Sequence, residues 1–348
     1  MNRRNLLATS SLFFIGEVFP QSKTFIADSH NHYGIALRRE TDIKNTLGTK
    51  MKEAGVSLLS WSIIPDGPFL GFSLFSGIYQ KKKPESGNLL KSFDKQIDVI
   101  EEALKVNGVK LVKSIEDLDL AKKGEPHVVL NCEGADFLEG ELHGLKYAFD
   151  RGIRHIQLVH YIDSPVGDRQ TDKPIFNGLS DFGKSIIPKA NDEGLLIDLA
   201  HSTLNSIDQA LEISRVPVVW SHGYLSDHES SYTSGGHKAR ALPTKYAKKI
   251  ASKGGVIGLW GVGVTVGGSI KGYAAEIVKM VDLLGTEAVM FGSDTDGLPF
   301  GAVIKEIKDL RYVIDELYKL GLDDNSISCI AIDNYSKMLR SAINSKST

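Results

Sequence analysis

The chain has 348 residues, of which 42% are apolar and 24% are charged, so it can bury one large hydrophobic core. Its 41 basic and 43 acidic residues give a net charge of -2 and are spread along the sequence, which excludes the long basic surface of a nucleic-acid-binding protein. We therefore expect a single large domain that binds a small molecule.

The N-terminal segment has the features of an export signal. Arg3 and Arg4 precede a mostly apolar run at 6–15, and the adjacent arginines favour twin-arginine export. The run is too short to form a transmembrane helix. We expect residues 1–24 to direct export to the periplasm or the medium, and residues 25–348 to form the domain. If the segment is instead a helix packed on the domain, the protein stays in the cytoplasm.

Apolar and largely β-branched runs recur along the rest of the chain and predict strands. There are eight of them, at 25–32, 56–63, 127–133, 153–160, 195–201, 218–222, 256–260 and 289–294.

Segments between these runs predict helices from their apolar spacing and their end signals. A helix over 179–191 ends near Gly194, with a kink expected at Pro188. Another helix over 244–252 ends at Gly254. Strands and helices therefore alternate, which is typical of a parallel sheet.

Two further helices have clear signals at one end. Ser114 and Asp117 have the spacing of a capping box at a helix start. A later amphipathic helix is predicted before Gly321 by four apolar residues on one face, Ile307, Leu310, Ile314 and Leu317.

The segment 64–92 is rich in glycine, proline, serine and aromatic residues and predicts a long loop. Loops of this length often have a function, and we expect either a lid over the site or a contact between two copies of the chain.

Polar residues decide between two folds that both alternate strands and helices, the doubly wound open sheet and the (β/α)8 TIM barrel. Most of the predicted strands end in a histidine or an acid. A barrel gathers all carboxyl strand ends at one mouth, where its active sites lie, so the sequence predicts a TIM barrel. The residues in question are His30, His32, Glu133, His160, His201, His222 and Asp294.

These side chains are suited to binding metal ions. His30 and His32 project to the same side of one strand and can bind one ion, while His201 and His222 bind a second that Glu133 bridges to the first. Imidazole and carboxylate ligands suit zinc. Two zinc ions would lower the pKa of a shared water, and Asp294 is placed to take its proton.

Each residue also has a structural explanation. A single histidine at a strand end is more often a hydrogen-bonded structural residue than a ligand. Glu133 and Asp294 can be loop or cap carboxylates. The joint placement favours a metal site, because packing gives no reason to end strand after strand with such residues.

Five segments resemble, in order, the motifs of the membrane (renal) dipeptidase family of zinc peptidases, and the similarity extends from about residue 25 to the end of the chain. They are Asp28-Ser29-His30-Asn31, Cys132-Glu133-Gly134, Ile197-Asp198-Leu199-Ala200-His201, Ser221-His222 and Gly292-Ser293-Asp294-Thr295-Asp296-Gly297.

The resemblance implies a role for each matching residue. His30 binds one zinc ion, Glu133 bridges both, and His201 and His222 bind the second. Asp294 is the catalytic acid and base. Two more positions of the family contact the substrate. His160 matches the histidine that contacts the scissile carbonyl, and Arg240 matches the arginine that binds the free carboxylate. From the residues alone, Arg240 also fits a surface ion pair. A homodimer is implied as well.

His32 departs from the family pattern, which has an aspartate at this position. A neutral ligand replaces an anionic one, so the first zinc position has less negative charge and is expected to be weaker or to prefer another metal. The His-x-His pair resembles that of the wider amidohydrolase superfamily, which favours metal binding by His32.

The resemblance implies a dinuclear zinc dipeptidase that hydrolyses the peptide bond of dipeptides with a metal-activated water. One alternative is a related amidohydrolase that acts on N-acyl amino acids, lactams or lactones. The other is an exported protein that binds metal without catalysis because of the change at His32.

Overall fold

The structure, a computed structural model, describes residues 24–34, 46–73, 77–227, 237–298 and 301–346. The predicted export segment thus lies outside the described residues, except for Thr24. The helices of the described residues are too short or too polar for any of them to cross a membrane.

The core of the molecule is a parallel sheet whose strands follow one another in chain order. Their side chains are almost all buried, as expected for strands covered on both faces. The strands are β1 (Ile26–Asn31), β2 (Val56–Ile63), β6 (His127–Cys132), β7 (Ile153–Gln157), β8 (Leu196–Asp198), β9 (Val219–Trp220), β12 (Val256–Leu259) and β13 (Val289–Phe291). A short strand β5 (Lys110–Leu111) also pairs with β6.

The sheet closes into a barrel between its first and last strands. Asp294 N donates to His30 O at 3.0 Å, and His32 N donates to Thr295 O at 2.9 Å. The closure confirms the predicted (β/α)8 TIM barrel, as a single domain, against the open doubly wound sheet.

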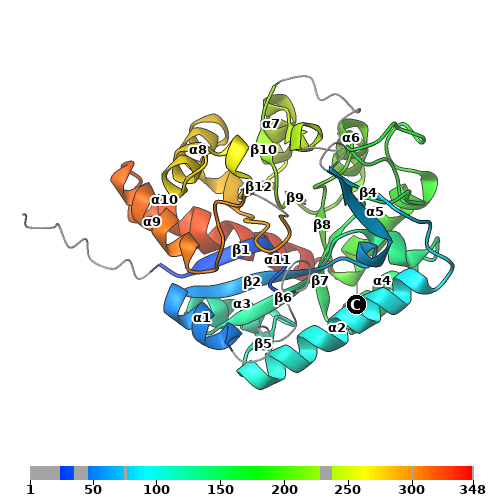
Figure 1. Cartoon of the computed structure of the whole chain (residues 1–348), viewed down its shortest axis with the longest axis horizontal. Coiled ribbons are helices and arrows are strands. Elements are labelled where there is room, and N and C mark those ends of the chain that lie inside the picture. The colour runs from blue at the N-terminus through cyan, green and yellow to red at the C-terminus, as the bar shows by residue number, and fades with distance from the viewer. Residues whose placement is uncertain (1–23, 35–45, 74–76, 228–236, 299–300, 347–348) are drawn as a thin grey trace, which may run out of the picture.

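Helices surround the strands on the outside of the barrel (Figure 1). They are α1 (Leu47–Ala54), α2 (Asn88–Asn107), α3 (Ile115–Lys122), α4 (Gly144–Asp150), α5 (Asp181–Glu193), α6 (Leu204–Ile213), α7 (Thr244–Ser252), α8 (Ile270–Leu284), α9 (Asp309–Lys319), α10 (Asp324–Ser328) and α11 (Asn334–Asn344). Short 3-10 turns and two small two-stranded sheets lie in the connections.

The C-terminal helix α11 closes the end of the barrel opposite the mouth. Its Tyr335 and Leu339 pack against residues at the amino-terminal ends of the strands, among them Ala27 and Leu58. This face of the barrel is therefore sealed by apolar contacts, and only the carboxyl ends of the strands are free to form a site.

The helix predictions agree with the structure where end signals were strong. Ser114 caps α3 in a capping box with Asp117, and α7 covers the predicted residues 244–252. The helix predicted before Gly321 is α9, although Ile307 precedes it. Helix α5 continues through Pro188 without interruption.

The segment 64–92 is more ordered than the predicted loop. Strands β3 (Leu70–Ser73) and β4 (Gly77–Gln80) pair as an antiparallel hairpin, and α2 begins at Asn88. Phe69 is buried in the core, whereas Phe72 and Tyr79 are about two-fifths exposed. The predicted lid or dimer contact stays a prediction.

Candidate metal centre

The barrel brings the predicted site residues together at the carboxyl ends of its strands. His30 is the penultimate residue of β1 and His32 directly follows that strand, while each of the others lies just beyond a different strand. All seven are at most 7% exposed: His30, His32, Glu133, His160, His201, His222 and Asp294.

The two histidines at the carboxyl end of β1, His30 in the strand and His32 just after it, converge with two carboxylates. His30 Nε2 and His32 Nε2 are 3.1 Å apart. His32 Nε2 also lies 3.2 Å from Glu133 Oε2 and 3.4 Å from Asp294 Oδ1. These atoms form the first half of the centre.

Two other histidines converge on the second oxygen of the same glutamate. His201 Nε2 and His222 Nε2 are 3.2 Å apart. They lie 3.1 Å and 3.4 Å from Glu133 Oε1. Glu133 Oε1 thus faces His201 and His222 and also His30, whose Nε2 lies 3.5 Å away, whereas Oε2 faces His32.

This donor set fits metal ions. Ligand atoms of His30, His32 and Asp294, and of His30, Glu133 and His222, lie close enough in each set to share one ion. Nitrogen lone pairs that face one another at such distances repel unless a cation or a proton lies between them. Imidazole nitrogens beside a buried carboxylate are typical zinc ligands.

Hydrogen bonds to the far ring nitrogens orient the histidines. His32 Nδ1 lies 3.2 Å from the carbonyl of Ser62, which can only accept, so Nδ1 carries the hydrogen and Nε2 faces the centre. His222 Nδ1 lies 2.9 Å from Ser221 Oγ. Two of the four rings are thereby fixed with Nε2 inward.

The protonation of the cluster in the metal-free chain differs between its halves. Burial opposes a charge on His32, but hydrogen bonds to Asp294 and Glu133 outweigh it and raise the pKa of His32 to about 10. Burial lowers the pKa of His201 and of His222 well below the usual range, with the charge of Arg240 adding to it. A metal ion therefore competes with a proton mainly at His32.

Glu133 is ionised despite its burial. Burial raises the pKa of a carboxyl group, but the positive charges of His160 and His30 outweigh it and hold the pKa of Glu133 well below the usual range. The bridging position thus carries a negative charge.

Two site residues have a strained backbone. His201 has a φ of 68° and Asp294 a φ of 55°. Both lie in the left-handed region of the backbone, which residues other than glycine rarely adopt. Such strain is kept where the surrounding fold fixes it, and it is common at functional sites.

Arg240 is buried beside the cluster and not in a surface ion pair. It is 1% exposed, and its Nε and Nη1 have no hydrogen-bond partner among the described residues. Its guanidinium lies 5.7 Å from the ring centre of Trp260. Burying donors without partners is costly, so the unpaired nitrogens are suited to an anionic ligand.

Sequence reasoning missed one polar contact of the site. His160 Nδ1 lies 2.8 Å from Asp66 Oδ1, and His160 Nε2 lies 3.5 Å from Glu133 Oε1. Asp66 follows the predicted strand 56–63, which was one of two without a polar residue at its end. The missing polar residue at the end of this strand was the feature of the sequence that could have pointed to Asp66.

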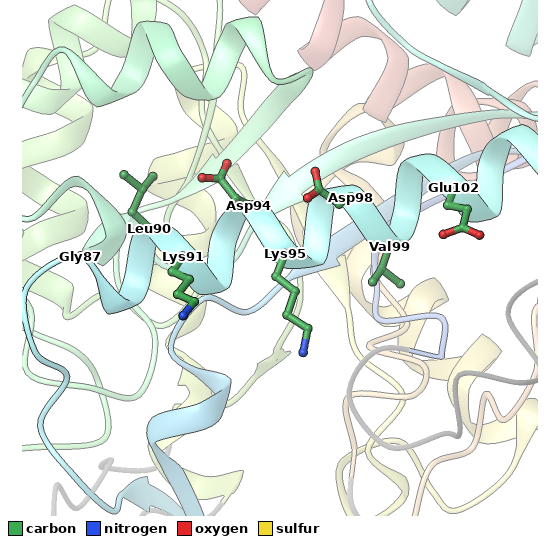
Figure 2. A pocket seen from close by; sticks show the side chains of 8 residues that line it. All are labelled: Gly87, Leu90, Lys91, Asp94, Lys95, Asp98, Val99 and Glu102. Carbon is green, nitrogen blue, oxygen red and sulfur yellow. The ribbon is translucent and has the colours of Figure 1, made fainter.

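A groove of about 650 Å³ on the outer face of α2 is a poorer candidate for the site. Figure 2 shows that Lys91, Lys95 and Glu102 line it from this one helix. Its lining contains no histidine or cysteine among the described residues, so it lacks the ligands that the barrel mouth provides.

The chain is similar to known dipeptidases in sequence. A family model described as membrane dipeptidase (peptidase family M19) matches residues 18–348. An uncharacterized dipeptidase of Schizosaccharomyces pombe is 26% identical over 318 residues, which cover 85% of this chain and 74% of the relative. Dipeptidase verJ of Clonostachys rogersoniana is 26% identical over 246 residues, 68% of this chain and 62% of the relative.

Solved structures share the fold at lower identity. The dipeptidase AC, a metallopeptidase of family M19, superposes with a TM-score of 0.76 at 17% identity, over 92% of this chain and 100% of that one. A metallopeptidase of Rhodobacter sphaeroides, liganded with a phosphinate mimic of the dipeptide L-Ala-D-Ala, gives 0.72 at 18% identity, over 92% and 99%.

Proposed function

Because the chain belongs to the membrane dipeptidase family, peptidase family M19, we propose that it hydrolyses the peptide bond of dipeptides at two zinc ions. The family is one of metal-dependent hydrolases. Beyond this family membership, we propose three things: that the substrate is a dipeptide, that the metal is zinc, and that two ions are bound.

One observation carries the proposal: the two oxygens of Glu133 lie against different histidines, Oε2 against His32 and Oε1 against His201 and His222 as well as His30. Oε2 lies 3.2 Å from His32 Nε2, and Oε1 lies 3.1 Å from His201 Nε2. A carboxylate that presents its oxygens in this way is suited to bridge two ions, with His30 and His32 on one and His201 and His222 on the other.

Zinc bound at this centre would supply a nucleophilic water of lowered pKa and polarise the carbonyl of the substrate. Asp294, beside His32 at the mouth, takes the proton of the water and returns it to the leaving amine. His160 donates a hydrogen bond to the carbonyl oxygen of the scissile bond through Nε2.

Arg240 binds the free carboxylate of the dipeptide. Its Nε and Nη1 have no partner among the described residues, so the planar guanidinium has donors available for a carboxylate, and hydrogen bonds from a planar group favour one orientation of the ligand. Recognition of that carboxylate would restrict the enzyme to short substrates that end within the pocket.

The replacement of the family's aspartate by His32 keeps a second candidate open, a related amidohydrolase for N-acyl amino acids, lactams or lactones. A panel of these compounds and of dipeptides with L- or D-residues at the carboxyl side separates the two, since only the first candidate prefers dipeptides. Zinc binding without turnover of any compound would instead indicate a metal-binding protein without catalysis.

The Asp294→Asn variant tests the assigned chemistry. We expect close to two zinc ions per chain in both proteins by metal analysis, and loss of turnover by at least about 100-fold in the variant, because asparagine cannot accept the proton. Asp181→Asn, at a fully exposed side chain on α5, is the matched control and should keep full activity.

Retained turnover in Asp294→Asn would remove Asp294 from its role. A protein that binds one zinc ion, or none, would contradict the dinuclear centre itself.

A further inference from the structure

The side chain of Asp66 does not cap the short helix that follows it. Asp66 lies at the N-cap position of the 3-10 helix Gly67–Phe69, where an aspartate commonly accepts a hydrogen bond from its own helix, but its side chain makes no such bond. The backbone forms the turn instead, since Phe69 N donates to Asp66 O at 2.8 Å. The carboxylate is thus available to accept hydrogen bonds from another part of the chain.

The carboxylate of Asp66 contacts one nitrogen of His160. Its two oxygens lie 2.8 Å and 2.9 Å from His160 Nδ1, and Tyr161 N donates to Oδ2 at 3.3 Å. An ionised carboxylate only accepts, so His160 Nδ1 carries a hydrogen. The ring atom that faces the metal centre is therefore Nε2.

We propose that Asp66 is a positioning residue, which holds the ring of His160 so that Nε2 points at the carbonyl of the substrate. The inference rests on the proposed function, because His160 has a carbonyl to contact only if a dipeptide binds over the centre.

Burial makes the arrangement rigid. Asp66 is 1% exposed and His160 is 5% exposed, so water does not replace their hydrogen bond. Rotation of the ring would leave the buried carboxylate with only the longer bond from Tyr161 N, and the loss of a donor to a buried charged group costs more free energy than the bond itself contributes. One orientation of His160 is thereby favoured before the substrate binds, which reduces the cost of reaching the transition state.

A second buried carboxyl group in the same pocket provides a matched control. Asp136 is 2% exposed, and neither of its oxygens forms a hydrogen bond to His160. Burial and the nearby charge of Asp66 raise the pKa of Asp136 to about 7. Asp136→Asn therefore alters a neighbouring buried acid without removing a contact to the ring.

Kinetics and metal content of the Asp66 variants test the proposal. In the zinc-loaded enzyme, we expect Asp66→Ala to lower kcat about 10- to 100-fold, as loss of an orienting partner typically does, with KM and zinc content within about twofold of the wild type. Asp66→Asn should retain more activity, because its amide oxygen still accepts from Nδ1. Asp136→Asn should change kcat less than about twofold. A merely structural Asp66 would instead lower zinc content and folded fraction, with kcat per loaded enzyme unchanged.

A double-mutant cycle with His160→Ala asks whether Asp66 acts through the ring. If it does, Asp66→Ala has no further effect on kcat once His160 is absent. Losses that multiply in the double variant would overturn the proposal.

Nitrogen-15 NMR of histidine-labelled protein provides a readout that does not depend on turnover. We expect a protonated Nδ1 for His160 in the zinc-loaded wild type and a shift of that resonance in Asp66→Ala. An unprotonated Nδ1, or an unchanged resonance in the variant, would refute the positioning role. A wild type that hydrolyses no dipeptide would contradict the proposed function instead, while the resonance still decides the orientation of the ring.

Discussion

At the scale of single residues, the guanidinium of Arg240 is notable because it is buried with no ion pair to an acid in the described part of the chain. Its Nε and Nη1 are unpaired among the described residues, whereas the partly buried Arg151 bonds to acids of α2. Unpaired donors of this kind destabilise the free protein, and a ligand that satisfies them recovers the cost on binding. Affinity and selectivity for a carboxylate then have a common origin.

Replacing Arg240 with methionine should weaken the binding of substrates that carry a free carboxylate. Hydrogen bonds to charged groups contribute about 1.5–3 kcal/mol, so we expect KM to rise roughly 10- to 100-fold with a smaller change in kcat. A dipeptide amide is the control substrate, and its kcat/KM should change little. Equal losses for both substrates would show that Arg240 supports the fold and does not bind the carboxylate.

The sequence located the site residues better than the bonds between them. His30, Glu133 and Asp294 were predicted to meet because parallel strands share one mouth, and they do. Asp66 was not predicted, because it acts from a turn beyond its strand and its partner is 94 residues away. Contacts made from such turns depend on the loop conformation, which has no periodic pattern in the sequence.

At the scale of secondary-structure elements, most strands are shorter than the apolar runs that predict them, although β2 covers the whole of 56–63. The runs 153–160 and 195–201 end in His160 and His201, whereas β7 ends at Gln157 and β8 at Asp198. The last residues of each run leave the strand ladder to place a side chain in the centre. Hydrophobicity marks both parts in the same way, so the sequence cannot separate them.

Helix α11 also could not be assigned its place from sequence. It was not among the helices predicted from the sequence, and a helix with one apolar face does not by itself show which surface that face covers. In the structure Leu339 is fully buried against the amino-terminal ends of the strands, at the closed end of the barrel. The helix should therefore contribute to stability and leave the chemistry of the mouth unaffected.

Leu339→Ala should destabilise the protein without changing the active site. Removal of a fully buried leucine side chain costs about 2–5 kcal/mol, which should lower the denaturant midpoint, while kcat and zinc content of the folded protein stay constant. Leu283→Ala on α8 is the control, because this leucine is 44% exposed and should cost about 0.5 kcal/mol or less. Similar midpoints for the two variants would mean that α11 is not part of the cooperative core.

At the scale of the whole molecule, zinc binding and folding are linked through His32. In the metal-free chain the pKa of His32 is raised from 6.5 to about 10, so its bound proton stabilises the fold fully below about pH 6.5. This contribution is lost as the pH rises toward 10. A ligand nitrogen must be deprotonated, so zinc at His32 displaces that proton, and the stability of the loaded protein does not share this pH dependence.

The stabilisation by zinc should therefore increase with pH. At a fixed free zinc concentration, each unit between pH 6.5 and 8.5 should add about 1.4 kcal/mol, or roughly 2–3 °C, to the difference in Tm between loaded and chelator-stripped protein. His201 and His222 add no such slope, because their pKa values lie well below 6.5. His32→Asp is the matched variant and should flatten the dependence, since aspartate is already ionised in this range. Calorimetry of both proteins at two pH values measures the effect, and a wild-type difference that is the same at pH 6.5 and 8.5 would exclude His32 as a ligand.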